Sequence, residues 1–144
     1  MNKVILITGC SSGFGMLTAA KLAAAGHTIY ATMRNLQKQN ALMLELEQRD
    51  TMCQILHLDV TEDKSINKVI DTIEKQAGRL DVLINNAGYG IGGFFEDLLE
   101  DEIRSQFETN FFGVQKVTRS ALPLMRATAS KSSKDFSTKI INVS

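Results

Sequence analysis

The fold of this chain is decided by one short stretch of sequence, Thr8-Gly9-Cys10-Ser11-Ser12-Gly13-Phe14-Gly15. It follows the apolar run Val4–Ile7, which predicts a strand that is buried on both faces. It precedes residues 16–25, whose alanines and leucines predict a helix that ends at Gly26. A glycine-rich turn between a strand and a helix is typical of dinucleotide-binding sites, since the free N–H groups of the helix face the phosphates.

Each glycine of this turn is expected to have a separate role. Gly9 lets the chain turn sharply off the strand, Gly13 lets the backbone approach a pyrophosphate, and Gly15 lets the helix pack close to the sheet. The spacing Gly-x3-Gly-x-Gly differs from the generic Gly-x-Gly-x-x-Gly, so the prediction depends on the strand and helix around it. We expect the phosphate side of the site to consist of Gly9, Ser11, Ser12, Gly13, Phe14 and Gly15.

The composition indicates one globular domain over residues 1–144 and excludes several classes of protein. Hydrophobic residues make up 44% of the chain, and the single proline argues against disorder. The net charge is zero and no basic cluster occurs, so we expect neither nucleic acid nor a membrane as a partner. Cys10 and Cys53 are too few for a disulfide framework or a zinc site, so we expect a cytoplasmic protein without a metal.

Hydrophobic periodicity predicts the remaining elements. Strands are expected at residues 28–32, 52–58, 80–84 and 139–143, and helices at 36–49, from Thr61 to Gly78, and at about 97–127. Pro123 is expected to kink or end the last helix, and residues 129–138 read as a solvated loop. Because strands alternate with helices, we predict an α/β fold, a doubly wound parallel sheet with helices on both faces and a ligand at the carboxyl ends of its strands.

Three further motifs accompany the glycine turn, namely Asp59-Val60, Asn85-Asn86-Ala87-Gly88 and Asn110. With them, the whole chain resembles the short-chain dehydrogenase/reductase family, which has a Rossmann fold. The combination of a Thr-Gly-x-x-x-Gly-x-Gly turn with Asn-Asn-Ala-Gly some seventy residues later is far more specific than either motif alone. Residues 8–13 and 30–35 look closest to the hydroxysteroid and retinol dehydrogenase branch.

The resemblance implies roles for these residues. Asp59 would contact the adenine through its carboxylate, and Val60 would contact it through its N–H. Asn86 would lie near the adenine ribose, and the small Ala87 and Gly88 would let the cofactor pass against the backbone. Asn110 would be catalytic, because in the family the backbone carbonyl of the matching asparagine holds a water in a proton relay.

The residues after the second strand bear on the choice of cofactor. NAD-dependent enzymes place an acidic residue there, whereas an arginine accommodates the additional phosphate of NADP. Met33 occupies the acidic position here and Arg34 follows it, while Ser12 could add a hydroxyl donor. We therefore predict NADP rather than NAD, and an ordinary solvated role for Arg34 is the alternative.

The family's catalytic Tyr-x-x-x-Lys is not found in this sequence, since Arg34 follows Tyr30 at that spacing and Gly93 follows Tyr89. Ser144 matches the first serine of the family's Asn-x-Ser-Ser, of which the second is catalytic. The chain is thus expected to be the cofactor half of an NADP-dependent oxidoreductase acting on an alcohol or carbonyl compound. An inactive NADP(H)-binding or interaction module and a non-functional fragment are the alternatives.

Two consequences are expected for a chain of this extent. The fifth strand becomes an exposed sheet edge. The apolar side of the long helix, led by Phe107 and Phe111, favours a homo-oligomer. Cys10 is expected to be a small packed residue; the alternative is a thiolate stabilised at a helix N-terminus, whose oxidation would impair binding.

Overall fold

The structure, a computed structural model, describes residues 2–131 and 137–144. Its centre is one sheet of five parallel strands in the order β3-β2-β1-β4-β5. The strands are β1 (Val4–Ile7), β2 (Thr28–Met33), β3 (Gln54–His57), β4 (Val82–Asn85) and β5 (Lys139–Asn142). The chain runs outward from β1 to β3 on one side and returns to β4 on the other, so the predicted doubly wound fold is confirmed.

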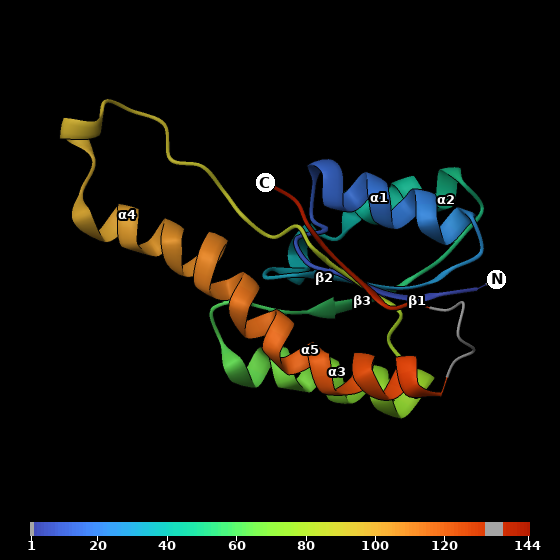
Figure 1. Ribbon diagram of the computed structural model, residues 1–144. Coiled ribbons are helices and arrows are strands. Elements are labelled where there is room, and N and C mark those ends of the chain that lie inside the picture. Colours follow the sequence, from blue (N-terminus) through green and yellow to red (C-terminus); the bar gives the residue numbers. More distant parts are fainter. Residues whose placement is uncertain (1, 132–136) are drawn as a thin grey trace.

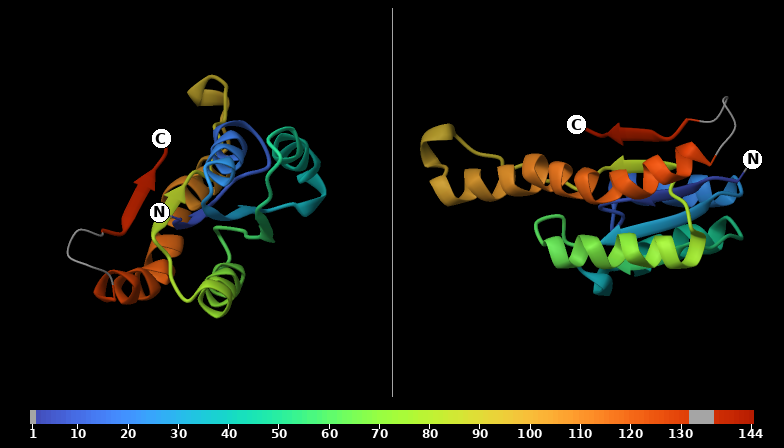
Figure 2. Two further views of the ribbon diagram at one scale, coloured as in Figure 1. Left: turned by 90° about the vertical axis from the view of Figure 1, so that its right-hand side faces the viewer. Right: turned by 60° about the horizontal axis from the view of Figure 1, so that its bottom comes forward.

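Helices cover both faces of the sheet, which gives three layers (Figure 1 and Figure 2). One face carries α1 (Gly13–Ala24) and α2 (Asn40–Gln48), and the other carries α3 (Asp63–Ala77) and α5 (Gly113–Ser130). α3 ends at Ala77, and its C-cap residue Gly78 has a φ of 65°, the left-handed conformation that glycine adopts without steric strain.

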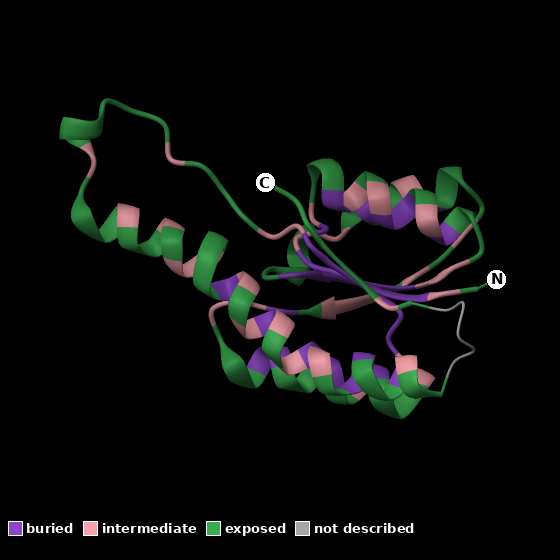
Figure 3. Cartoon of the chain, viewed as in Figure 1, coloured by how far each residue is buried: buried purple, intermediate pink, exposed green. Residues whose placement is uncertain are grey.

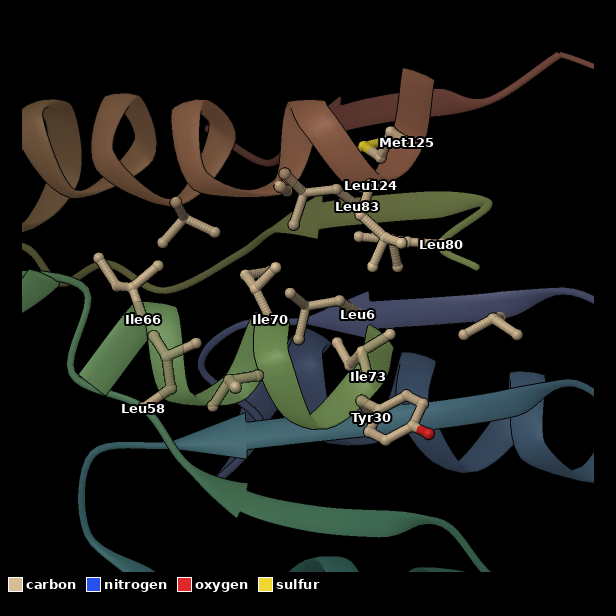
Figure 4. Close-up of a cluster of buried hydrophobic side chains, with 14 of the residues drawn as sticks. Leu6, Tyr30, Leu58, Ile66, Ile70, Ile73, Leu80, Leu83, Leu124 and Met125 are labelled. Carbon is tan, nitrogen blue, oxygen red and sulfur yellow. The ribbon is translucent and has the colours of Figure 1, made fainter. Parts of the chain in front are cut away.

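Alternate residues of the central strand supply the two halves of the core. Ile5 and Ile7 pack with α1 and α2, while Val4 and Leu6 pack with α3 and α5. Figure 4 shows the second half, in which Leu6 and Leu83 of the sheet meet Ile70 and Ile73 of α3. Both faces of β1 are therefore buried, as the continuous apolar run predicts.

Several element boundaries differ from the prediction. α1 begins at Gly13, so the last two glycines of the turn belong to its first turn. Residues 36–49 form a short 3₁₀ turn (η1, Leu36–Lys38) followed by α2. Pro123 does not end α5, because it lies on the exposed side, where water can reach the carbonyl that it leaves unpaired. Part of the predicted loop 129–138 lies outside the described residues.

The long predicted helix is interrupted, and the part of the chain before α5, residues 95–112, forms an arm that extends from the body of the domain (Figure 1). A 3₁₀ turn (η2, Phe95–Asp97) precedes α4 (Glu100–Phe107), and a π-helical turn (η3, Glu108–Phe112) joins α4 to α5. The arm is mostly exposed, whereas burial concentrates in β1, β2, β4 and the inward sides of the helices (Figure 3). Phe107 and Phe111 are more than half exposed, and all residues of β5 are exposed, so the expected apolar arm and open sheet edge are both present.

Candidate nucleotide-binding cleft

Hydrogen bonds join the carboxyl ends of β1 and β4, the two strands between which the order of the sheet reverses. The hydroxyl oxygen of the buried Thr8 accepts hydrogen bonds from the backbone N–H groups of Asn86 and Ala87, both at 3.0 Å. In return, Asn86 Nδ2 donates to the carbonyls of Thr8 at 3.0 Å and Gly9 at 2.9 Å. The glycine turn after β1 is thereby fixed to the Asn-Asn-Ala-Gly segment after β4.

The glycines of the turn are required for different physical reasons. Gly9 has a φ of +73°, and a Cβ there would lie 2.7 Å from Ala87 Cα. A Cβ on Gly15 would lie 2.3 Å from both Asn86 Nδ2 and the Gly9 carbonyl, so its close contacts are with this turn and with the segment after β4 rather than with a strand. Gly13 has a φ of +58°, and among the described residues a Cβ there would meet no atom within 4 Å outside its own helix and its chain neighbours, so the space beside it is open.

The N-terminus of α1 lies beside this open space, and the first N–H groups of a helix have no partner within the helix itself. Ser12 is the N-cap residue, but its side chain makes no capping hydrogen bond. α1 has no acidic residue in its first turn, so its positive dipole end is not neutralised within the helix. The turn can therefore offer backbone N–H groups to an anion, which is the cradle that a pyrophosphate requires.

The loop after β3 forms a second wall of the cleft and is held by its own hydrogen bonds. Asp59 Oδ1 accepts from the N–H and the hydroxyl of Thr61, at 2.9 and 2.7 Å. The N–H of Asp59 donates to Ser65 Oγ of α3 at 2.9 Å. Val60 packs so closely on α5 that a Cβ on Gly113 would lie 2.6 Å from Val60 Cγ2.

The π-helical turn places Asn110 against the loop after β4. Asn110 Oδ1 accepts from the N–H of Tyr89 at 3.0 Å, and Asn110 Nδ2 donates to the Tyr89 carbonyl at 2.7 Å. A Cβ on Gly88 would lie 3.1 Å from Asn110 Oδ1, so glycine permits this approach. The side chain of Asn110 thus holds the loop, and its backbone belongs to a π turn, a distortion that is common at functional sites.

Lys116 of α5 links the second wall to the π turn. Its Nζ donates to the Thr61 carbonyl at 3.0 Å and to Glu108 Oε1 at 2.6 Å. The hydrogen bond with Glu108 raises the pKa of the lysine above its ordinary value. The loop that carries Asp59 and the turn that carries Asn110 are therefore connected through one side chain.

These elements enclose a cleft of about 820 Å³ at the carboxyl ends of the strands. That volume lies within the range of about 300 to 1,000 Å³ that is usual for small-molecule and cofactor sites. The predicted residues that line it are Gly9, Ser11, Ser12, Gly13, Phe14, Arg34, Asp59, Val60, Asn86, Ala87, Gly88 and Asn110. Gly15 is buried beneath the turn and is the predicted residue that does not line the cleft.

Sequence reasoning did not assign Leu58, Tyr89, Thr109, Val114 and Val143 to the site, although all of them line the cleft. Leu58 and Val143 come directly after β3 and β5, so their position at strand ends was a usable signal. Tyr89 and Thr109 are neighbours of predicted site residues. The role of Thr8 in joining the strand ends gave no separate signal, because a threonine beside an apolar run also fits an ordinary strand.

Arg34 and Cys10, two residues near the turn, differ in their exposure to solvent. Arg34 is exposed on the rim of the cleft, and within the described ranges it has no hydrogen-bond or ion-pair partner. Cys10 is fully buried, and burial raises the pKa of its thiol to about 12. Cys10 therefore fits the expectation of a small packed residue, because burial disfavours the charged thiolate.

Over residues 2–131 and 137–144 no group of His, Cys, Asp and Glu side chains could hold a metal ion. No helix in the described part of the chain is long and apolar enough to cross a membrane.

The fold and the position of the cleft define a Rossmann-type domain. A family model described as short chain dehydrogenase matches residues 3–144, and the chain belongs to this family. It is 41% identical over 142 residues to a 3-ketodihydrosphingosine reductase of Bacteroides thetaiotaomicron, covering 99% of this chain and 46% of the relative. It is 38% identical over 130 residues to retinol dehydrogenase 8 of Bos taurus, covering 86% of this chain and 40% of the relative.

Several solved protein structures have a fold similar to that of this chain. A short-chain dehydrogenase of Streptomyces avermitilis matches with a TM-score of 0.82 and 37% identity, covering 100% of this chain and 49% of that chain. Actinorhodin polyketide ketoreductase, solved with NADPH, matches with a TM-score of 0.84 and 26% identity, covering 98% of this chain and 52% of that chain. An NADH-dependent reductase of alginate metabolism matches with a TM-score of 0.82 and 26% identity, covering 98% of this chain and 57% of that chain. The chain thus spans about half the length of these proteins.

Proposed function

We propose that this chain binds NADP(H) in the cleft and is the cofactor-binding half of an oxidoreductase that interconverts an alcohol and a ketone or aldehyde. The observation that carries the proposal is the open space at Gly13, where the N–H groups at the start of α1 face the cleft. The names of two relatives, a keto-compound reductase and a retinol dehydrogenase, support the alcohol–carbonyl class.

The residues of the chain would bind and orient the dinucleotide along the cleft. The turn from Gly9 to Phe14 would hold the pyrophosphate, and Asp59 with Val60 would hold the adenine. Ala87 and Gly88 leave room for the cofactor beside the strand ends. Asn110 fixes the loop on the far side and is proposed as the catalytic residue of this half. The cofactor, when bound, supplies the hydride that is exchanged with the substrate.

We further propose NADP(H) as the preferred cofactor. Arg34 lies on the rim without a partner in the described chain, so its guanidinium is available to a 2′-phosphate. The residue before it, Met33, is buried and carries no carboxylate that would hold ribose hydroxyls. Similar folds are known with either cofactor, so the preference depends on this local chemistry.

A matched pair of glycine variants tests the proposal. Gly13 and Gly26 both have positive φ, and in the described part of the chain a Cβ at either one would meet no atom within 4 Å beyond its chain neighbours and its own helix, but Gly26 lies beyond the other end of α1. We expect Gly13→Glu to abolish NADPH binding in calorimetric titration, because its carboxylate occupies the phosphate position. Gly26→Glu should carry a similar backbone strain and retain binding. NADPH binding that survives Gly13→Glu would overturn the proposal.

A second experiment addresses the alternative of an inactive module. Binding without turnover, once the chain is joined to the carboxyl-terminal half of a family member, would favour that alternative.

We also propose that the arm pairs with a second copy of the chain. Phe107 and Phe112 are about half exposed on neighbouring turns, which leaves apolar surface that a partner would bury. Sedimentation should show a homo-oligomer that dissociates in a Phe107→Glu/Phe112→Glu variant, and a monomeric parent chain would contradict this.

A further inference from the structure

The loop that carries Asp59 is held at nearly every polar atom of that residue. Its N–H donates to Ser65 Oγ at 2.9 Å, and its carbonyl accepts from the N–H of Glu62 at 3.1 Å. Its Oδ1 accepts from the N–H and the hydroxyl of Thr61, at 2.9 and 2.7 Å. Both the backbone and the side-chain torsions of Asp59 are thereby restrained.

One atom of Asp59 is left available. Within the part of the chain that the structure describes, Oδ2 has no hydrogen-bond partner, and Asp59 lines the cleft. Since Thr61 occupies Oδ1, the direction of Oδ2 depends on how the backbone of Asp59 is oriented. That orientation is set by the hydrogen bonds of its N–H and its carbonyl.

Ser65 supplies the part of this restraint that comes from outside the loop. It is buried in the first turn of α3, and it does not line the cleft. Glu62 and Thr61 lie in the same loop as Asp59 and would move with it, whereas Ser65 belongs to a helix packed on the sheet. Ser65 Oγ also lies 3.4 Å from His57 Nδ1 of β3, a longer contact than the 2.9 Å hydrogen bond that it accepts from the N–H of Asp59.

We propose that Ser65 is a positioning residue that fixes Asp59 and so makes the cleft selective for adenine. A carboxylate held in a fixed direction accepts from the exocyclic amine of adenine, and it opposes the oxygen that hypoxanthine carries at that position. This inference rests on the proposed function, because it assumes that the adenine of NADP lies against Asp59. A serine outside the cleft then controls selectivity by way of the carboxylate.

The test compares NADP with nicotinamide hypoxanthine dinucleotide phosphate in calorimetric titrations of the 144-residue chain. The parent chain should bind NADP at least about tenfold more tightly, the size expected for one hydrogen bond to a charged group. Ser65→Ala should reduce that ratio to about threefold or less, because Asp59 can then reorient. Ser65→Thr keeps the hydroxyl and should restore the ratio.

Two controls separate positioning from stability. Ser120→Ala removes a hydroxyl that also contacts α3, at Asn67 Oδ1, but lies away from Asp59, so it should leave the ratio unchanged. In an Asp59→Asn background, Ser65→Ala should have no further effect on the ratio, because two residues that act as one unit are not additive.

The outcomes are distinguishable. If Ser65→Ala keeps the preference for NADP, or weakens both nucleotides equally together with a lower melting temperature, Ser65 is structural only and the inference is wrong. If the parent chain binds neither nucleotide, the proposed function itself fails.

Discussion

Thr8 and Asn86 hold the ends of β1 and β4 together by reciprocal hydrogen bonds. Thr8 Oγ1 accepts from the N–H of Asn86, and Asn86 Nδ2 donates to the carbonyl of Thr8, both at 3.0 Å. The two strands are neighbours in the sheet although β2, β3 and three helices separate them in the chain. The shape of the glycine turn is therefore determined by a contact across the switch point as well as by its own sequence.

Replacing Thr8 tests this contact. Thr8→Val keeps the shape but leaves the N–H groups of Asn86 and Ala87 without their acceptor, so the free energy of unfolding should fall by about 2 to 4 kcal/mol. Thr8→Ser keeps the oxygen and should lose only about 1 kcal/mol for the missing methyl group. Guanidinium unfolding measures both. Equal losses in the two variants would show that the hydroxyl is not what joins the strand ends.

The choice of cofactor can be read from Arg34. Arg34→Ala should weaken NADPH binding about 10- to 100-fold, because a charge-assisted hydrogen bond to the 2′-phosphate is lost. NADH, which lacks that phosphate, should bind as before. Arg119→Ala removes another exposed arginine, from α5, and serves as the control. Unequal binding of NADPH and NADH that persists in Arg34→Ala would place the 2′-phosphate elsewhere.

The sequence predicts the architecture well because β1 and the glycine turn are local signals. An apolar run followed by three spaced glycines restricts the chain to one kind of strand–helix junction, and the alternation of elements then gives the sheet. What it missed depends on contacts distant in sequence. The π turn at 108–112 inserts a residue into an otherwise continuous helical pattern, and its Asn110 is held by Tyr89, which no local periodicity reveals.

For the cleft, too, the sequence predicts which residues lie at strand ends but not the contacts that they make. Asp59, Val60 and Asn86 could be placed at strand ends from the sequence, and the structure brings them to one cleft. The amide of Asn86 is engaged with Thr8 and Gly9, however, so its side chain shapes the turn in addition to lining the cleft. Partners of this kind are set by tertiary packing, which is why spacing alone could not assign them.

The thiols of Cys10, which is buried, and Cys53, which is partly buried, predict a pH dependence of stability. Burial raises the pKa of Cys10 from 9.0 to about 12 and that of Cys53 from 9.0 to about 11. Below pH 9 both states keep the protons; above it the unfolded chain releases them first, so stability falls as pH rises through this window. By pH 10 each cysteine should account for about 1 kcal/mol of the loss. Urea titrations should show a shallower decline between pH 8.5 and 10.5 in Cys10→Ala/Cys53→Ala, and parallel slopes would contradict the burial effect.

Asn110 should control how firmly the loop after β4 is closed. Its side chain pairs with both the N–H and the carbonyl of Tyr89, and Lys116 connects the same π turn to Thr61 through Glu108. Asn110→Ala removes both contacts with Tyr89, so hydrogen exchange at the Tyr89 amide should accelerate about tenfold, the equivalent of one net hydrogen bond. Asn110→Asp keeps the acceptor but sets an oxygen against the Tyr89 carbonyl, so it should be no better than alanine. Amides within β1 should exchange as in the parent chain in both variants. Faster exchange throughout the sheet would instead mean that Asn110 supports the whole domain, and unchanged exchange at Tyr89 would mean that the loop is held by other contacts.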